Sequence, residues 1–494
     1  MLKLNSPLRR ALLLASSSLC LVGTGTAFAQ DSAATQESTE ADSKGSDIVV
    51  TGSRIAGSKI TEALPVTVLG QDDIAATAAV SGDELFRSIP AMGASVFNSV
   101  NGQTSSNFAR GDVGSVNLRN LGVGNTLVLL NGRRVVAHPS SQANSDLVPV
   151  LTYNTNAIPT SGLQRLEVLR DGAAALYGTD AVAGVVNTIL RDNINGGSIE
   201  MQYGGAEGTG LREFSTSGYL GSDFAGNRGN ASLFFSYTNR TALNSQDQDF
   251  TATGDRRADF VGTSFEGLNT LDRRNTLSGW GDFATIGFTG AVRQGTTALT
   301  TAGGVFSIQP TANGGCQAAL AGGICIDDGI RATAAADRNT RSDAQMNFPI
   351  SVVPRLDRVN LYATTHYDLN DNLTLFGEAG FYYAKTRSIQ DSVFSIGSLP
   401  MDIPASNYWN PFGPMTFANG QANPNRLANL NIPASGLAIR LTNYRFMDLG
   451  PTVVDVTNKQ YRLLGGLRGE TLGFNWESAL LYSEATVGDT QDGI

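Results

Sequence analysis

The sequence predicts an α+β domain followed by an antiparallel transmembrane β-barrel that residues 1–494 do not complete. Three observations support this fold class. An export signal opens the chain, short strands and helices alternate over residues 64–192, and long strands of alternating character follow Gly196. Strands of this second kind are typical of barrels that cross a membrane, because lipid-facing and lumen-facing residues alternate along them.

Residues 1–29 have the pattern of a secretory signal peptide, which is removed and takes no part in the fold. The pattern has a positive start, an apolar stretch and a small-x-small cleavage site: Lys3, Arg9 and Arg10, then residues 11–22, then Ala27-Phe28-Ala29. The apolar stretch is shorter than the roughly 20 residues of a transmembrane helix. A lipoprotein signal ending at Cys20 is the alternative, but Leu19 stands where such signals resemble one another in having a small residue.

Charge and cysteine content restrict the partners and the compartment. The chain has 35 Lys and Arg against 44 Asp and Glu, a net charge of −9, and loss of residues 1–29 leaves −12. So acidic a chain is a poor binder of nucleic acid. Once Cys20 has left with the signal, only Cys316 and Cys325 remain. An even pair in an oxidising compartment predicts a disulfide between them.

Residues 30–58 are predicted to be a disordered tail that contains one strand-forming segment. Residues 31–46 are small, polar and acidic, and cannot bury a core. The strand-forming segment consists of Asp47, Ile48, Val49, Val50, Thr51, Gly52 and Ser53. It is either the first edge strand of the next domain or a strand offered to another protein by β-augmentation.

Residues 59–194 are predicted to form the α+β domain. Strands are expected over 65–70, 125–136, 163–170 and 183–190, and short helices over 72–77, 83–89 and 173–178. The strongest local signal is Asn131-Gly132 between two apolar runs. This pair predicts a type I′ hairpin turn, because both central residues need positive φ.

Residues 195–494 are predicted to be a partial outer-membrane barrel. Leu375 and Phe381 share one face of an expected strand, and Glu378 and Tyr382 share the opposite face. Phe474, Trp476, Leu480 and Tyr482 alternate in the same way with Asn475, Glu477 and Ser483. Residues 368–371 are expected to make a tight periplasmic turn. The Gly-, Pro- and Asn-rich stretches 268–353 and 399–427 are expected to be extracellular loops.

Residues 195–494 provide about half the strands of a large barrel, at roughly 10 residues per span. An unclosed sheet would leave unpaired N–H and C=O groups in lipid. We therefore expect that residues 1–494 alone do not insert stably.

The sequence contains little that could support catalysis. The histidines are His138 and His366, and no cysteine pair has zinc-binding spacing. There is no Walker A loop, no H-E-x-x-H motif and no carboxylate pair spaced for acid–base work. We expect no enzyme activity, no metal and no cofactor.

Several stretches resemble the TonB-dependent outer-membrane receptors. Residues 47–53 resemble that family's TonB box, and residues 65–74, 117–135 and 163–191 resemble its plug domain. The positions that match the plug signature are Arg119, Asn131, Gly132, Arg133, Glu167, Arg170, Tyr177, Gly178, Gly184 and Asn187. Asp171-Gly172 and Ala183 depart from the common pattern. The resemblance implies a plug inside a barrel of 22 strands in the outer membrane of a Gram-negative bacterium, importing scarce solutes with energy passed on by TonB.

We expect the plug charges to meet polar groups of the barrel lumen, although they could be ordinary surface charges: Arg119, Arg133, Arg134, Glu167 and Arg170. Ligand contacts are expected from residues 98–112, 138–146 and 399–427. The ligand class stays open among siderophores, vitamins and oligosaccharides. Four aromatic residues of the last stretch could stack on a sugar or catechol, or anchor the loop at the membrane interface: Tyr408, Trp409, Phe412 and Phe417.

Three other functions compete with import. A passive pore would lack the plug and segment 47–53. A signal-relaying receptor would have a further N-terminal domain, whereas 17 residues separate Ala29 from Asp47. A truncated, non-functional product is the third.

Overall fold

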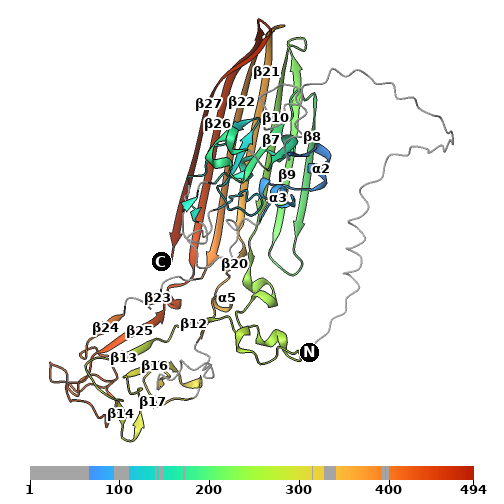
Figure 1. Cartoon of the computed structure of the whole chain (residues 1–494). Coiled ribbons are helices and arrows are strands. Elements are labelled where there is room, and N and C mark those ends of the chain that lie inside the picture. The colour runs from blue at the N-terminus through green and yellow to red at the C-terminus, as the bar shows by residue number, and fades with distance from the viewer. Residues whose placement is uncertain are drawn as a thin grey trace, which may run out of the picture. The chain divides into compact units, whose positions relative to one another are not determined.

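The computed structural model shows three regions, which we call the plug, the wall and the cap (Figure 1). It describes residues 66–93, 111–139, 142–143, 149–150, 152–170, 173–313, 315–327, 341–391, 395–396 and 400–493. The signal peptide and the segment 47–53 lie outside these residues. In the described residues, no helix is both long and apolar enough to cross a membrane.

The plug is an α+β domain with a five-stranded sheet in the order β1-β6-β7-β2-β3. Its main elements are β1 (Val66–Leu69), α2 (Gln71–Ala76), α3 (Gly82–Arg87), β2 (Thr126–Leu130), β3 (Arg133–Arg134), β6 (Leu163–Leu169), α4 (Ala174–Tyr177) and β7 (Gly184–Leu190). Strands β2 and β7 are parallel, and the other neighbours are antiparallel. A separate pair joins β4 (Gln142–Ala143) to β5 (Pro149–Val150).

Local sequence explains the plug's elements. Asn131 and Gly132 have φ of 51° and 75°, so the predicted hairpin turn between β2 and β3 is confirmed. The Ser81 side chain accepts a hydrogen bond from the Glu84 N–H and caps α3. Every residue of β2 is buried, because apolar side chains pack against both faces of the sheet.

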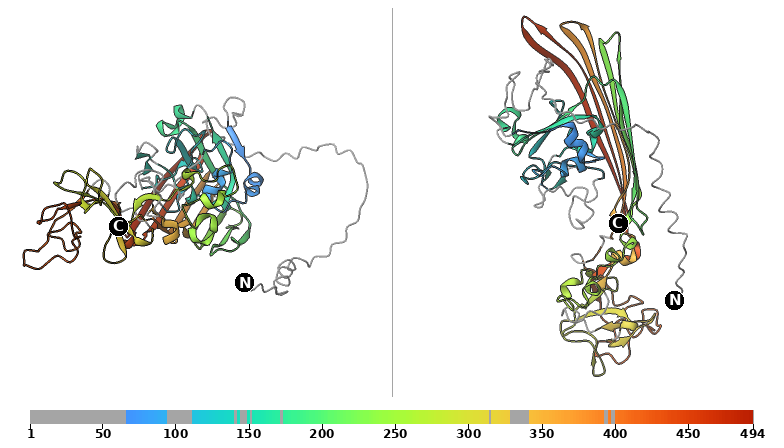
Figure 2. Two further views of the ribbon diagram at one scale, coloured as in Figure 1. Left: turned by 90° about the horizontal axis from the view of Figure 1, so that it is seen from below. Right: turned by 90° about the vertical axis from the view of Figure 1, so that its right-hand side faces the viewer.

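The wall is a seven-stranded antiparallel sheet in the order β27-β26-β22-β21-β10-β9-β8. Its strands are β8 (Gly196–Gly205), β9 (Arg212–Phe224), β10 (Gly229–Arg240), β21 (Arg355–Asn370), β22 (Leu373–Gln390), β26 (Thr452–Thr471) and β27 (Phe474–Asp492). In the described residues the sheet is open, with β8 and β27 at its edges. The plug lies against one face of the wall (Figure 2).

The predicted alternation along the wall strands is confirmed. Leu375 is 46% exposed on the outer face, whereas Glu378 and Tyr382 lie against the plug. The predicted tight turn at residues 368–371 is displaced along the chain. Strand β21 continues to Asn370, and the turn follows at residues 371–372, where the Asn372 N–H donates to the Asn370 side chain. This Asx-type hydrogen bond favours the later position of the turn.

The cap consists of the two long connections of the wall, residues 241–354 and 391–451. They leave the wall at the end opposite the short turns that join β21 to β22 and β26 to β27. The cap's main sheet contains β13 (Asp282–Thr285), β16 (Val305–Pro310), β17 (Ala318–Ala319), β18 (Ile324–Asp327), β23 (Ser395–Ile396), β24 (Met401–Ile403) and β25 (Ile439–Arg445).

Smaller elements complete the cap. They are β11 (Leu243–Asn244) paired with β20 (Ser351–Val353), β12 (Asn275–Ser278) with β19 (Arg341–Ser342), β14 (Arg293–Gln294) with β15 (Thr297–Ala298), and the helix α5 (Ala344–Asn347). Pairing of β13 with β25 joins the two connections into one sheet. Its apolar core includes Phe306, Ile326 and Phe412. The stretches predicted as loops therefore contain a small folded unit.

Candidate functional site

The contact between plug and wall contains a buried charged network around Asp112. The Asp112 carboxylate accepts hydrogen bonds from the Tyr382 hydroxyl at 2.7 Å, the Arg358 Nη1 at 3.2 Å and the Asn156 Nδ2 at 3.1 Å. Arg358 on β21 and Tyr382 on β22 are diagonal neighbours on adjacent strands of the wall. Asp112 and Asn156 belong to the plug, so the network joins the two regions.

Burial makes the loss of either partner of the Asp112–Arg358 pair costly. The side chains of Asp112 and Arg358 are 8% and 5% exposed. The remaining donors of Arg358 reach the Val80 carbonyl and the Thr238 hydroxyl, at 3.3 Å and 3.2 Å. A buried pair whose other hydrogen-bonding groups are satisfied tolerates the loss of either partner poorly, since the other charge is then left uncompensated.

A second network connects the tip of the plug hairpin to the wall. Glu378 on β22 accepts hydrogen bonds from the Asn131 Nδ2 at 2.9 Å and the Tyr362 hydroxyl at 2.6 Å. Arg462 on β26 donates to the same carboxylate at 3.3 Å. Arg133, next to the turn, pairs with Glu477 on β27. The acidic residues Glu378 and Glu477 of the wall therefore bind the hairpin through Asn131 and Arg133.

Other residues of the plug signature position that hairpin. The Leu190 N–H donates to the Asn131 Oδ1, and the Gly132 N–H donates to the Asn187 Oδ1, both at 2.9 Å. Asn187 in turn reaches Glu167, which is fully buried and pairs with Arg165 at 2.8 Å. Side-chain hydrogen bonds thus hold the turn against β7.

Two further glycines of the signature meet backbone requirements. Gly178 ends α4 with φ of 96°, and Gly184 begins β7 with φ of 142°. A Cβ at Gly184 would overlap the Leu169 carbonyl and would lie 2.5 Å from the Leu118 Cδ2. Only glycine fits that position without displacing the neighbouring strand.

The plug charges have different partners, and their predicted contacts with the lumen hold in part. The Arg133 side chain pairs with the wall. Arg134 pairs with Asp180 inside the plug, and this hydrogen bond holds the pKa of Asp180 below its usual value. The Arg134 carbonyl accepts a hydrogen bond from Arg462, and the Tyr177 carbonyl accepts one from Arg134 at 2.6 Å. Arg119 donates to the Arg170 carbonyl within the plug.

The described ends of two predicted ligand stretches are buried. Asp112 ends the first stretch, 98–112, in the network above. His138 begins the second, 138–146, and its Nε2 lies 3.0 Å from the Asn458 Oδ1 on β26. Both residues thus contact the wall, and they are not available to a ligand in this arrangement. Most of the remaining residues of the two stretches lie outside the described residues.

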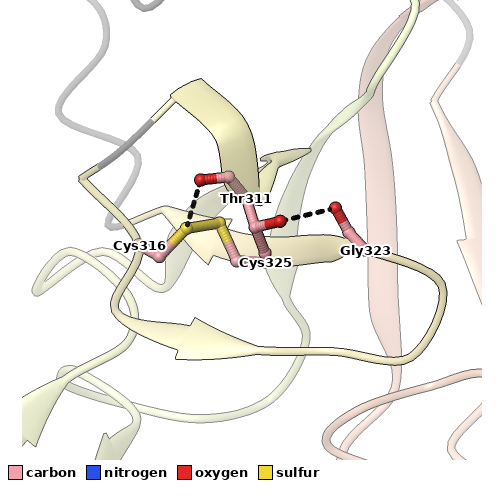
Figure 3. The surroundings of a disulfide bond; sticks show 4 residues. All are labelled: Thr311, Cys316, Gly323 and Cys325. Atoms are coloured by element: carbon pink, nitrogen blue, oxygen red, sulfur yellow. Dashed lines mark hydrogen bonds between the residues drawn. A yellow bond between two sulfur atoms is a disulfide. The ribbon is translucent and has the colours of Figure 1, made fainter.

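The predicted cysteine pair lies in the cap. Cys316 and Cys325 form a disulfide with Cα atoms 5.6 Å apart, which closes the hairpin of β17 and β18 (Figure 3). The Thr311 N–H and hydroxyl both donate to the Gly323 carbonyl at 3.0 Å and connect the hairpin to β16. The hairpin is therefore fastened at two places.

The four aromatic residues of the stretch 399–427 have separate environments. Phe412 is fully buried in the cap core against Phe306 and offers no surface on which a ligand could stack. Trp409 and Tyr408 are 70% and 50% exposed. Phe417 stacks on Tyr408 with ring centroids 6.2 Å apart. Of the four, Trp409 and Tyr408 are the ones that offer aromatic surface to a solute.

The described residues contain no group of three or more His, Cys, Asp or Glu side chains that could hold a metal ion.

Sequence reasoning did not identify Arg358 or the role of Asp112. A signal for Arg358 exists, because a charged residue within a long alternating strand faces the lumen and needs a partner there. That partner is more than two hundred residues away in the chain, and no local pattern identifies it.

A plug domain held by buried polar contacts against long antiparallel strands defines the class of plugged outer-membrane barrel proteins. The comparisons agree with this. Residues 58–185 match the family model of the TonB-dependent receptor plug domain. Residues 58–185 are therefore similar to the plug domains of TonB-dependent receptors.

Three curated relatives share similarity with parts of the chain. The ferric enterobactin receptor PirA of Pseudomonas aeruginosa is 31% identical over 37% of this chain and 24% of its own length. The vitamin B12 transporter BtuB of Photobacterium profundum is 31% identical over 30% of this chain and 21% of its own length. The ferrienterobactin receptor of Escherichia coli is 32% identical over 26% of this chain and 17% of its own length. The matched part thus spans a quarter or less of each relative.

Solved structures of receptors are similar over more of the chain. The ferric enterobactin receptor PfeA of Pseudomonas aeruginosa aligns with 87% of this chain and 59% of its own, at 15% identity and a TM-score of 0.36. The siderophore receptor PirA of Acinetobacter baumannii aligns with 87% and 48%, at 14% identity and a TM-score of 0.34.

Proposed function

We propose that this receptor actively imports a scarce solute, a siderophore, vitamin or oligosaccharide, across the outer membrane of a Gram-negative bacterium. The observation that supports this proposal best is the plug held against the wall by the Asp112 and Glu378 networks. A plug fastened in this way blocks free diffusion, so passage requires work on the plug. The relatives' names, which mention ferric enterobactin and vitamin B12, agree with import of large scarce solutes.

We propose that this work is delivered by TonB through residues 47–53. A strand that pairs edge-on with another protein gains affinity mainly from main-chain hydrogen bonds. Proline lacks the N–H that such pairing needs. Val49→Pro in the receptor should therefore abolish uptake and leave ligand binding at the cell surface intact, whereas Val49→Ala should have a mild effect.

Uptake and surface binding of a radiolabelled solute by whole cells test this proposal, with a TonB deletion strain as reference. If residues 47–53 belong instead to the plug's own sheet, Val49→Pro will lower surface binding and plug stability together. Uptake by Val49→Pro at the wild-type rate would rule out coupling through this segment. Uptake that continues without TonB would favour a passive pore.

A further inference from the structure

A cavity of about 410 Å³ lies in the cap, between the disulfide-closed hairpin and the stretch 399–427. Its volume is in the range of small-molecule binding sites. Leu320 and Ile324 of the hairpin form one wall, and Phe283 and Ile439 of the cap sheet contribute further apolar surface. The cavity is therefore apolar over most of its lining.

The cavity contains one charged side chain, Arg426. Its guanidinium donates to the carbonyls of Gly413 and Pro433, and no carboxylate of the described residues lies within 4.0 Å of it. Elsewhere in the cap Arg440 pairs with Asp402. A guanidinium has five N–H donors and cannot be deprotonated in proteins, so Arg426 presents a positive charge and unused donors to the cavity.

An aromatic ring lines the same cavity. Trp409 lines the cavity and is 70% exposed. Tyr408 packs edge-on against its indole with centroids 4.9 Å apart, and the Asn425 side chain donates to the Tyr408 carbonyl at 2.8 Å. This T-shaped contact leaves most of the indole exposed, so Trp409 has aromatic surface that can cover a flat apolar group.

We propose that this cavity binds a small anion that carries a flat aromatic ring, with Arg426 pairing with the anionic group and Trp409 covering the ring. Charge complementarity selects the anion, because the one charged lining residue is a cation whose described partners are neutral. The apolar walls select the ring. The proposal rests on the proposed function, import of a solute by this receptor.

The test uses two probes with the same ring, 4-nitrobenzoate and the uncharged 4-nitrobenzamide, which quench tryptophan fluorescence. The purified receptor is studied in detergent with Trp280→Phe and Trp476→Phe, so that Trp409 is the one tryptophan of residues 1–494 that can report. We expect saturable quenching by both probes. Arg426→Gln should weaken 4-nitrobenzoate binding at least tenfold, about 1.4 kcal/mol, and leave 4-nitrobenzamide binding unchanged.

Two variants sharpen the result. Arg426→Lys keeps the charge and should retain part of the affinity. Arg293→Gln removes an exposed cap arginine that also donates to a carbonyl but does not line the cavity, and it should bind both probes as wild type does. Equal 4-nitrobenzamide binding by wild type and Arg426→Gln shows that the cap remains folded.

Three outcomes would overturn the proposal: no quenching of Trp409 by either probe, unchanged 4-nitrobenzoate affinity in Arg426→Gln, or an equal loss in Arg293→Gln. None of them depends on energised uptake. Dependence of uptake on TonB is measured separately in cells, so failure of this cavity and failure of the import function are distinguishable.

Discussion

At the scale of single residues, the plug–wall contact combines side chains that are remote in sequence. Asp112 and Tyr382 are separated by 270 positions and meet at 2.7 Å with almost no access to solvent. Their neighbour Arg358 is also buried, and carboxylate, carbonyl and hydroxyl oxygens surround its donors. A charge buried in this way favours one arrangement of plug and wall over any displaced one.

Replacing Asp112 should therefore loosen the plug. Asp112→Asn leaves the Arg358 charge without its counter-charge, at a cost of about 3 kcal/mol for a buried pair. We expect faster cleavage of the plug by protease in membrane-embedded receptor. Asp402→Asn breaks an exposed pair with Arg440 and should change the cleavage rate little. Equal rates in wild type and Asp112→Asn would contradict the role given to this network.

The segment of the cap over residues 249–274 should lose stability in acid. Asp255 lies between Arg257 and Arg274, and the hydrogen bond from Arg257 lowers its pKa from 3.8 to about 2. Hydrogen bonding by Arg274 also lowers the pKa of Asp272. A carboxyl with a depressed folded-state pKa contributes stability above its unfolded value, and this contribution is lost as the pH falls through the folded value.

Hydrogen exchange over residues 249–274 should accordingly rise between about pH 4 and pH 2, after correction for the intrinsic rate. Asp255→Asn should exchange faster than wild type at neutral pH and show a smaller rise on acidification. A pH profile identical to that of wild type would show that Asp255 does not stabilise this segment.

The sequence predicts the turn conformation and the strand face of some of these residues, but it does not predict their contact partners. The Asn131-Gly132 turn is local chemistry, since positive φ is needed at both positions and both residues tolerate it. The lumen-facing phase of Glu378 and Tyr382 follows from strand periodicity. Their partners do not follow, because Asn131 and Asp112 reach them only when two separately folded regions meet.

At the scale of elements, the cap was the least predictable part. Its glycines, prolines and asparagines indicate loops, and many of its strands have only two to four residues. Strand β13 pairs with β25 across more than 150 positions, so neither connection alone contains the sheet. Short strands with non-local partners carry too few alternating residues for periodicity to detect.

The disulfide should stabilise its hairpin and the cavity wall that the hairpin provides. Cys316 and Cys325 close a short loop, which limits the stabilisation to about 3 kcal/mol. Replacing both cysteines by serine should weaken 4-nitrobenzoate binding and leave insertion of the receptor unchanged. Alkylation without reductant should find no free thiol in protein from the outer membrane. Two free thiols there would refute the predicted pairing.

At the scale of the whole molecule, one strand of the wall carries two of the polar networks that hold the plug. Glu378 and Tyr382 are four residues apart on β22, which corresponds to about 13 Å along a strand. Glu378 binds the hairpin and Tyr382 binds Asp112, and the two side chains share no hydrogen-bond partner among those described above. Work on the plug can therefore break one attachment while the other still holds.

Independence of the two attachments can be measured with a double-mutant cycle. Sites more than about 7–10 Å apart without shared partners add to within roughly 0.5 kcal/mol. The free energy of plug release by urea, followed by protease sensitivity, should fall in Asp112→Asn and in Glu378→Gln, and should fall by the sum in the double variant. If the free energy of plug release in the double variant falls by much less than the sum, the plug leaves the wall in one cooperative step. Loss of either network would then already have released both.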